Sequence, residues 1–162
     1  MTTNIVTADE ASDTISIPAD ATAEGLIADA KAEFEKAGIP FTYFDKDLLQ
    51  LIRQDQDLVR GKILKVITHN FGRDWETSEG RDWQKSLGTD GNTAAFLAWV
   101  MKTQPTGWFV SIANDDVRIF RHSNGLLYAP CFRRGVDHRE LYHNGVWYGW
   151  DGYRSLVAFS AI

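Results

Sequence analysis

The C-terminal third contains the stretch that decides the fold, RELYHNGVWYGWDGYRSLVAF at residues 139–159. Apolar and polar side chains alternate along much of it, which is the pattern of a half-buried strand. The dipeptides Asn144-Gly145 and Asp151-Gly152 interrupt the pattern, and Asn124-Gly125 lies upstream. Such dipeptides tolerate the positive φ that a two-residue hairpin turn requires. Residues from about 108 to 162 are therefore predicted to form an antiparallel β-meander of five or six strands.

Two-residue turns would also fix the register of the last strands, because counting outward from each turn pairs the residues. The count places Gly149 between Glu140 on one flanking strand and Arg154 on the other. Since glycine carries no side chain, Glu140 and Arg154 are expected to meet over it as an ion pair. The row beside this pair would hold Tyr142 and Trp147, so one face of the sheet would be both charged and aromatic.

The region before the sheet, at about 22–104, has helical periodicity. A first helix is predicted to begin near residue 20 or 22 and to end at Gly38. A second helical region follows Asp45, and the polar sequence RQDQD at 53–57 indicates a break or kink within it. Asn92 is predicted to cap a later helix. Beyond the break, a further helical stripe is predicted from Val59, Ile63, Val66 and Ile67.

The chain of 162 residues is predicted to form one α+β domain over 21–162, with N-terminal helices packed on the C-terminal sheet. Residues 1–20 are expected to form an acidic, mobile arm. Residues 1–35 hold eight acidic residues and one basic residue, a net charge of −7, whereas the whole chain carries −5. The body is therefore almost neutral, which gives only weak support to nucleic-acid binding.

The composition predicts a cytoplasmic location. The single cysteine, Cys131, excludes an internal disulfide framework and favours a reducing compartment. No apolar run reaches the roughly 18 residues that would cross a bilayer, and the N-terminus lacks the pattern of a signal peptide. We expect no membrane association.

No motif assigns a catalytic residue. The phosphate-loop, dinucleotide, zinc-finger and serine-hydrolase signatures are absent, and Cys131 is expected to be a small buried hydrophobe. Strand alternation would place His138 and Glu140 on one face and His143 on the other, so no metal and no cofactor are expected. The sequence leaves an enzymatic activity open and favours its absence.

The residues that remain are typical of an interface, because arginine and aromatic residues are enriched at the centres of protein interfaces. The sequence predicts a non-catalytic protein-binding or inhibitor-type accessory domain that uses the loop and sheet surface at 131–154, with a partner protein or a second copy bound there. The predicted binding residues are Arg133, Arg134, His138, Arg139, Glu140, Tyr142, Trp147 and Arg154.

Two alternatives use the same surface. A small metal-independent nuclease, or another enzyme acting on phosphodiesters, would need a base, an acid and a cation near one phosphate, and His138, Glu140 and Arg134 supply those groups. A sugar- or base-binding module would stack its ligand on Trp147 and Tyr142.

Overall fold

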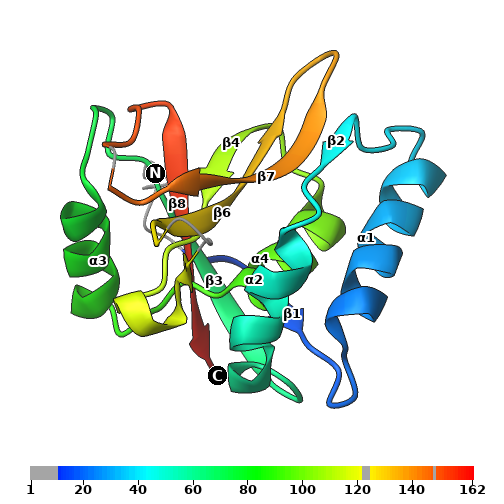
Figure 1. The fold of residues 1–162 in the computed structure, drawn as a ribbon, viewed down its shortest axis with the longest axis horizontal. Helices are drawn as coiled ribbons and strands as arrows, with labels where there is room; N and C mark the ends of the chain where they lie inside the picture. The colour runs from blue at the N-terminus through cyan, green and yellow to red at the C-terminus, as the bar shows by residue number, and fades with distance from the viewer. Residues whose placement is uncertain (1–10, 122–124, 148) are drawn as a thin grey trace, which may run out of the picture.

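A computed structural model describes residues 11–121, 125–147 and 149–162. It has an α+β fold in which helices lie on both sides of a mixed sheet (Figure 1). The helices are α1 (Ala23–Lys36), α2 (Leu48–Asp55), α3 (Thr77–Ser86) and α4 (Thr93–Thr103). The strands are β1 (Ala11–Ser16), β2 (Tyr43–Phe44), β3 (Ile63–His69), β4 (Gly107–Val110), β5 (Phe120–Arg121), β6 (Leu127–Arg134), β7 (Arg139–Gly145) and β8 (Arg154–Ala161). None of the described helices is long and apolar enough to span a bilayer.

Strand order differs from a meander. The described strands follow the order β1-β3-β8-β4-β6-β7-β2, and β5 pairs with β6. The β4–β8 and β2–β7 pairs are parallel, and the others are antiparallel. The α+β class is confirmed, but the prediction of helices followed by a purely C-terminal antiparallel meander is wrong, because β1, β2 and β3 interleave with the helices.

Strand β3 occupies the segment that was predicted to be a helix. In its sequence ILKVITH, Leu64 and Val66 are buried while Lys65 is exposed, which is strand alternation. The β-branched residues also suit a strand that is paired on both edges, by β1 and by β8. The predicted break is confirmed, since α2 ends at Asp55 and a single 3₁₀ turn, Gln56–Leu58, follows it.

Strand β1 lies within the segment that was expected to be a mobile arm. Ala11–Ser16 pairs with β3, and Ile15 and Ile17 are buried in the core. The expectation is therefore wrong for this half of the arm, because burial of Ile15 and Ile17 anchors the strand. Residues 1–10 lie outside the described residues.

Two of the three predicted hairpin turns are wrong. Strand β7 continues through Asn144-Gly145, where Gly145 pairs with Tyr128 of β6. Gly145 is needed for another reason, since a Cβ there would lie 2.5 Å from the Trp147 ring. Asp151-Gly152 precedes β8, but β8 pairs with β3 and β4 and not with β7. The β5–β6 hairpin is confirmed, although Asn124 of its Asn124-Gly125 signal lies outside the described residues.

The two faces of the sheet are covered by two hydrophobic clusters. One joins α1, α2 and α4 to the sheet through residues such as Phe34, Phe132 and Leu141. The other lies on the α3 side and contains Trp75, Trp150, Val110, Cys131 and Leu156. Figure 1 shows α3 on one side of the sheet and α1 and α2 on the other.

Candidate functional site

Four side chains form a row across four neighbouring strands. Glu140 of β7 lies opposite Arg133 of β6, Arg133 lies opposite Trp108 of β4, and Trp108 lies opposite Arg154 of β8. Residues that are directly opposite in a sheet project from the same face. These four residues, called the Trp108 row below, share the α3 side of the sheet with Cys131, two residues along β6 from Arg133.

An ion pair orients the outer part of the row. The Arg133 Nε donates to Glu140 Oε1 at 2.7 Å, and the Arg133 guanidinium carbon lies 4.7 Å from the centre of the Trp108 ring. The hydrogen bond from Arg133 lowers the pKa of Glu140, so this carboxylate is ionised at neutral pH. The predicted pairing of Glu140 with Arg154 over Gly149 is wrong, because β7 and β8 are not neighbours.

Arg154 lies at the inner end of the row and is buried, with 7% of its surface exposed. Its guanidinium carbon is 5.4 Å from the ring centre of Trp108, 5.9 Å from that of Tyr142 and 5.5 Å from that of Trp150. Its Nη1 donates to Cys131 Sγ at 3.6 Å. No described carboxylate forms an ion pair with Arg154, and its Nε has no hydrogen-bond acceptor among the described atoms.

The hairpin between β6 and β7 extends the row. Gly135 N donates to His138 O at 3.0 Å, which closes a turn with Val136 exposed at its tip. The His138 ring packs under Gly135, where a Cβ would lie 2.5 Å from its Cε1, and it is 6.4 Å from the Trp108 ring. His138 and Glu140 therefore lie on the same side of the hairpin, as strand alternation predicted.

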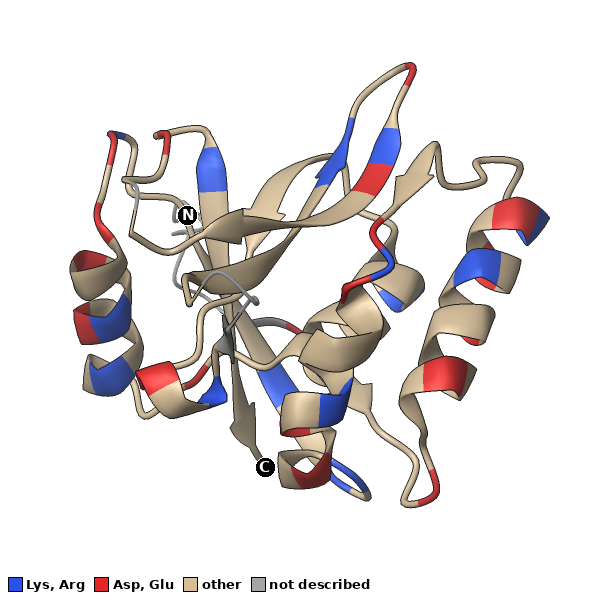
Figure 2. Cartoon of the chain, viewed as in Figure 1, with Lys and Arg blue, Asp and Glu red and all other residues tan. Residues whose placement is uncertain are grey.

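The remaining predicted residues do not form one surface. Arg134 donates to Gln104 O at 2.6 Å and Arg139 donates to Pro40 O at 3.1 Å, so both tie the hairpin to the body from the opposite face. Tyr142 stays near Arg154, and burial raises the pKa of its hydroxyl. Trp147 packs on Tyr128, away from the row. Figure 2 shows basic and acidic residues side by side on this hairpin.

The surroundings of Cys131 disfavour a role as a nucleophile. The residue is completely buried, and burial raises the pKa of its thiol to about 12, even though Arg154 acts in the opposite direction. A thiol with this pKa carries almost no thiolate at neutral pH. The expectation of a small buried hydrophobe at this position therefore agrees with its surroundings.

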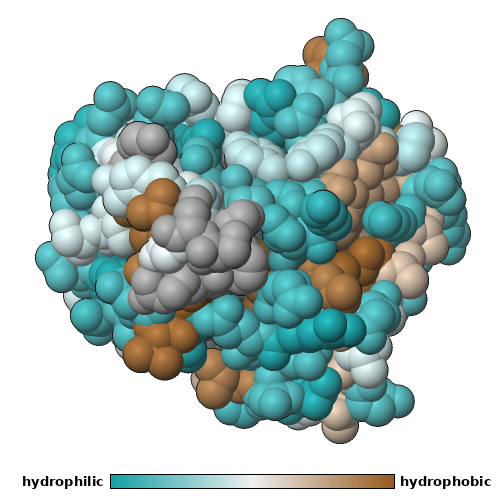
Figure 3. Space-filling view, viewed as in Figure 1, coloured by the Kyte–Doolittle hydropathy of each residue, from teal (hydrophilic) through white to brown (hydrophobic). Residues whose placement is uncertain are grey.

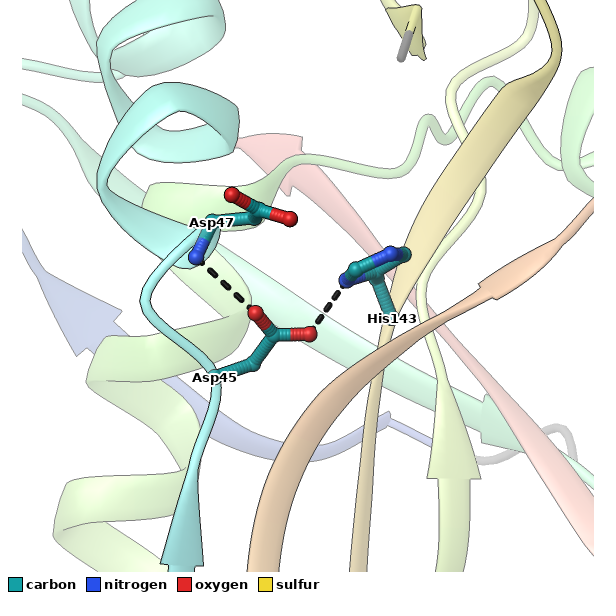
Figure 4. Close-up of side chains that lie close together, drawn as sticks. All are labelled: Asp45, Asp47 and His143. Carbon is teal, nitrogen blue, oxygen red and sulfur yellow. Dashed lines mark hydrogen bonds and ion pairs between the residues drawn. The ribbon is translucent and has the colours of Figure 1, made fainter. Parts of the chain in front are cut away.

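A second cluster of polar side chains, Asp45, Asp47 and His143, was not predicted from the sequence. The Asp47 N–H donates to Asp45 Oδ1 at 2.9 Å, and the other oxygen of Asp45 pairs with His143 Nδ1 (Figure 4). One ligand atom from each side chain lies within 4.8 Å of the others, a donor set that could hold a divalent metal. The parallel pairing of β2 with β7 brings these distant segments together, and no local signal predicts it.

An apolar groove lies beside this cluster, between α1 and α2. Its volume is about 450 Å³. Figure 3 shows hydrophobic surface over this part of the molecule. The apolar lining comes from Ile27, Ala28, Phe44 and Leu49.

Comparisons with known proteins found no match to a protein-family model, a curated protein or a solved structure.

Proposed function

We propose that this chain is a non-catalytic binding domain that holds a protein partner against the Trp108 row and the adjoining hairpin. One observation carries the proposal: arginine and aromatic side chains from four strands gather around Trp108 on one face. Tyr153, with 54% of its surface exposed, packs edge-on against Trp108 with 4.9 Å between ring centres. Rigid aromatic rings beside arginines are what interface centres prefer.

Charge favours a protein over a nucleic acid. Arg133 is already paired with Glu140, and Arg134 and Arg139 point to backbone carbonyls on the other face. The arginines of the hairpin therefore do not form a continuous basic surface, and the chain as a whole carries −5. Binding to a phosphate backbone depends on several unpaired cations along one face.

The exposed tip of the hairpin supports a docked partner. Val136 has 94% of its surface exposed, and Tyr153, which packs against Trp108, has 54% exposed. Both would lose water contact against a partner, at about 25 cal/mol per Å² of apolar surface buried.

The proposal is tested by measuring partner binding to variants on the row and to control variants off it. A protein that binds the chain in a lysate of the native host is first identified. The affinity of that protein for purified Arg133→Ala and Tyr153→Ala is then measured. Both should bind at least about tenfold more weakly, equivalent to about 1.4 kcal/mol. Arg134→Ala and Trp147→Ala, whose side chains lie off the row, are the controls. Equal loss in all four variants, or in none, would contradict the proposal.

The same variants distinguish self-association of this chain from binding to a different protein. If the partner is a second copy, the molecular mass in solution should be that of a dimer at high concentration, and Arg133→Ala should restore the monomer. The row would then be a homodimer interface.

A second candidate, a phosphodiester-acting enzyme, is favoured by one contact. His138 lies on the same side of the hairpin as Glu140, and the Glu140 carboxylate is paired with Arg133 at 2.7 Å. Arg134 would have no role, because it binds Gln104 O on the opposite face. Cleavage of RNA or DNA that resists a chelator and is lost in His138→Ala, but kept in His69→Ala, would establish this candidate. Intact RNA and DNA after prolonged incubation would exclude it.

A further inference from the structure

We infer that Arg154 anchors a site for an oxyanion, and that the partner supplies this anion as the carboxylate of an acidic side chain. The inference rests on the proposed function, because it names the chemical group that the partner places on the Trp108 row.

The charge of Arg154 is the first argument. A buried ion without a counter-ion costs several kcal/mol, and two other arginines that are largely shielded from water have carboxylate partners. Arg81 pairs with Asp116 at 2.7 Å, and Arg133 pairs with Glu140 at 2.7 Å. Arg154 is more deeply buried than either, yet no described carboxylate pairs with it. The aromatic rings around the Arg154 guanidinium offset part of the free-energy cost of burying its charge. A bound anion would offset more of that cost.

The donor groups of Arg154 provide the second argument. Arg154 Nη1 is directed at Cys131 Sγ, 3.6 Å away, while the Nε–H has no acceptor. The edge formed by Nε and Nη2 carries two parallel donors that match the two oxygens of a carboxylate. The rings of Trp108, Tyr142 and Trp150 surround the guanidinium. A planar carboxylate can lie in the guanidinium plane between such rings, whereas a phosphate group is tetrahedral and wider.

Movement of the Tyr153 side chain would give a ligand access to Arg154. Tyr153 is the residue before Arg154, it is exposed, and its ring leans edge-on against Trp108 at 4.9 Å. In the described structure its hydroxyl donates to Asp151 Oδ2 at 2.7 Å and also lies within reach of the Arg154 side chain. Outward rotation of this single side chain would break that bond and uncover the inner end of the row. A carboxylate that replaced the ring would then reach Arg154.

Titration of the purified chain tests the site directly. An acetylated Asp/Glu peptide is added at constant ionic strength while tryptophan fluorescence and the melting temperature are recorded, with inorganic phosphate as the second arm. The wild type should show a saturable change with the peptide and a weaker one with phosphate. Arg154→Met should lose at least about tenfold in affinity, equivalent to about 1.4 kcal/mol. Arg81→Met, which removes an arginine already paired with Asp116, should titrate like the wild type.

Each outcome decides the inference. Methionine fits the buried site without a charge, so Arg154→Met is expected to fold. Arg154→Lys keeps the charge but loses the planar guanidinium with its two parallel donors, so this variant should bind the peptide with intermediate affinity. Equal binding by Arg154→Met, or no saturable change in the wild type, would overturn the site. Tighter binding of phosphate would overturn the assignment to a carboxylate. If Arg133→Ala loses the partner while Arg154→Met keeps it, the proposed function stands and this inference fails.

Discussion

Arg133 and Glu140 face each other across β6 and β7, with 2.7 Å between Arg133 Nε and Glu140 Oε1. Both side chains are partly exposed, 32% and 23%, and such a pair contributes about 0–1 kcal/mol to stability. Its main effect is geometric, because it fixes the Arg133 guanidinium 4.7 Å from the centre of the Trp108 ring.

Removing the Glu140 charge should therefore change binding more than stability. In Glu140→Gln, Arg133 loses its charged partner and becomes free to leave the Trp108 ring. We expect urea denaturation to show less than about 1 kcal/mol of destabilisation, while partner affinity falls several-fold. A loss of several kcal/mol of stability would show that the pair is part of the core instead.

Asp55 predicts a pH-dependent stability. This buried carboxylate accepts from the Thr93 N–H at 2.5 Å and from the Ala94 N–H at 3.3 Å, at the start of α4. Burial nevertheless raises the pKa of Asp55 to about 7. Because the folded state holds this proton more tightly than the unfolded state, the stabilisation is complete below about pH 4 and is lost as the pH rises through about 7.

Denaturant unfolding of the wild type and Asp55→Asn at several pH values isolates this contribution. Asparagine has no ionisable proton to lose, so the wild type should lose up to about 4 kcal/mol relative to the variant between pH 4 and pH 8. A difference between the two proteins that does not change with pH would refute the linkage.

Gly91 should not tolerate even alanine. A Cβ at this position would lie 2.2 Å from Ile112 O, a backbone atom that cannot move aside by a change of rotamer. We expect Gly91→Ala to cost at least about 2 kcal/mol in thermal or urea denaturation. Gly38→Ala is the matched control, since a Cβ there meets nothing within 4 Å and only its φ of +79° opposes the change. The close approach would be disproved if Gly91→Ala cost no more than Gly38→Ala.

The Asp45–His143 pair should stabilise the junction of β2 and β7. Asp45 is 6% exposed and its carboxylate contacts His143 Nδ1, so His143→Ala would leave a buried carboxylate with less compensation. We expect a loss of about 2 kcal/mol or more in urea denaturation. Asp47→Ala, at a more exposed member of the cluster, should cost less. Equal costs would mean that burial of Asp45 does not set the size of the effect.

Local signals in the sequence predicted the helix caps well. Thr22 accepts from Gly25 N and Asn92 accepts from Ala95 N, which places the starts of α1 and α4 where capping chemistry indicated. Alternation along β7 also separated Glu140 from His143 correctly. Each of these features depends on residues within a few positions of one another.

Long-range pairing could not be predicted in this way. Gly145 and Gly152 permit turns, but Trp150 pairs with Trp75 and the chain then enters β8 between β3 and β4. The Trp108 row depends on the parallel β4–β8 pair, so Trp108 was not among the predicted site residues although its neighbours were. Strand β3 was mistaken for a helix because its buried residues satisfy both spacings over so short a segment.

The central claim, that a protein partner docks on the Trp108 row, is tested most directly by hydrogen exchange of the complex against the free chain. We predict slower exchange on binding in two segments, 133–142 and 151–154, with α1 and α2 unchanged. Slower exchange confined to the groove between α1 and α2, with no change in the β6–β7 hairpin, would contradict the claim.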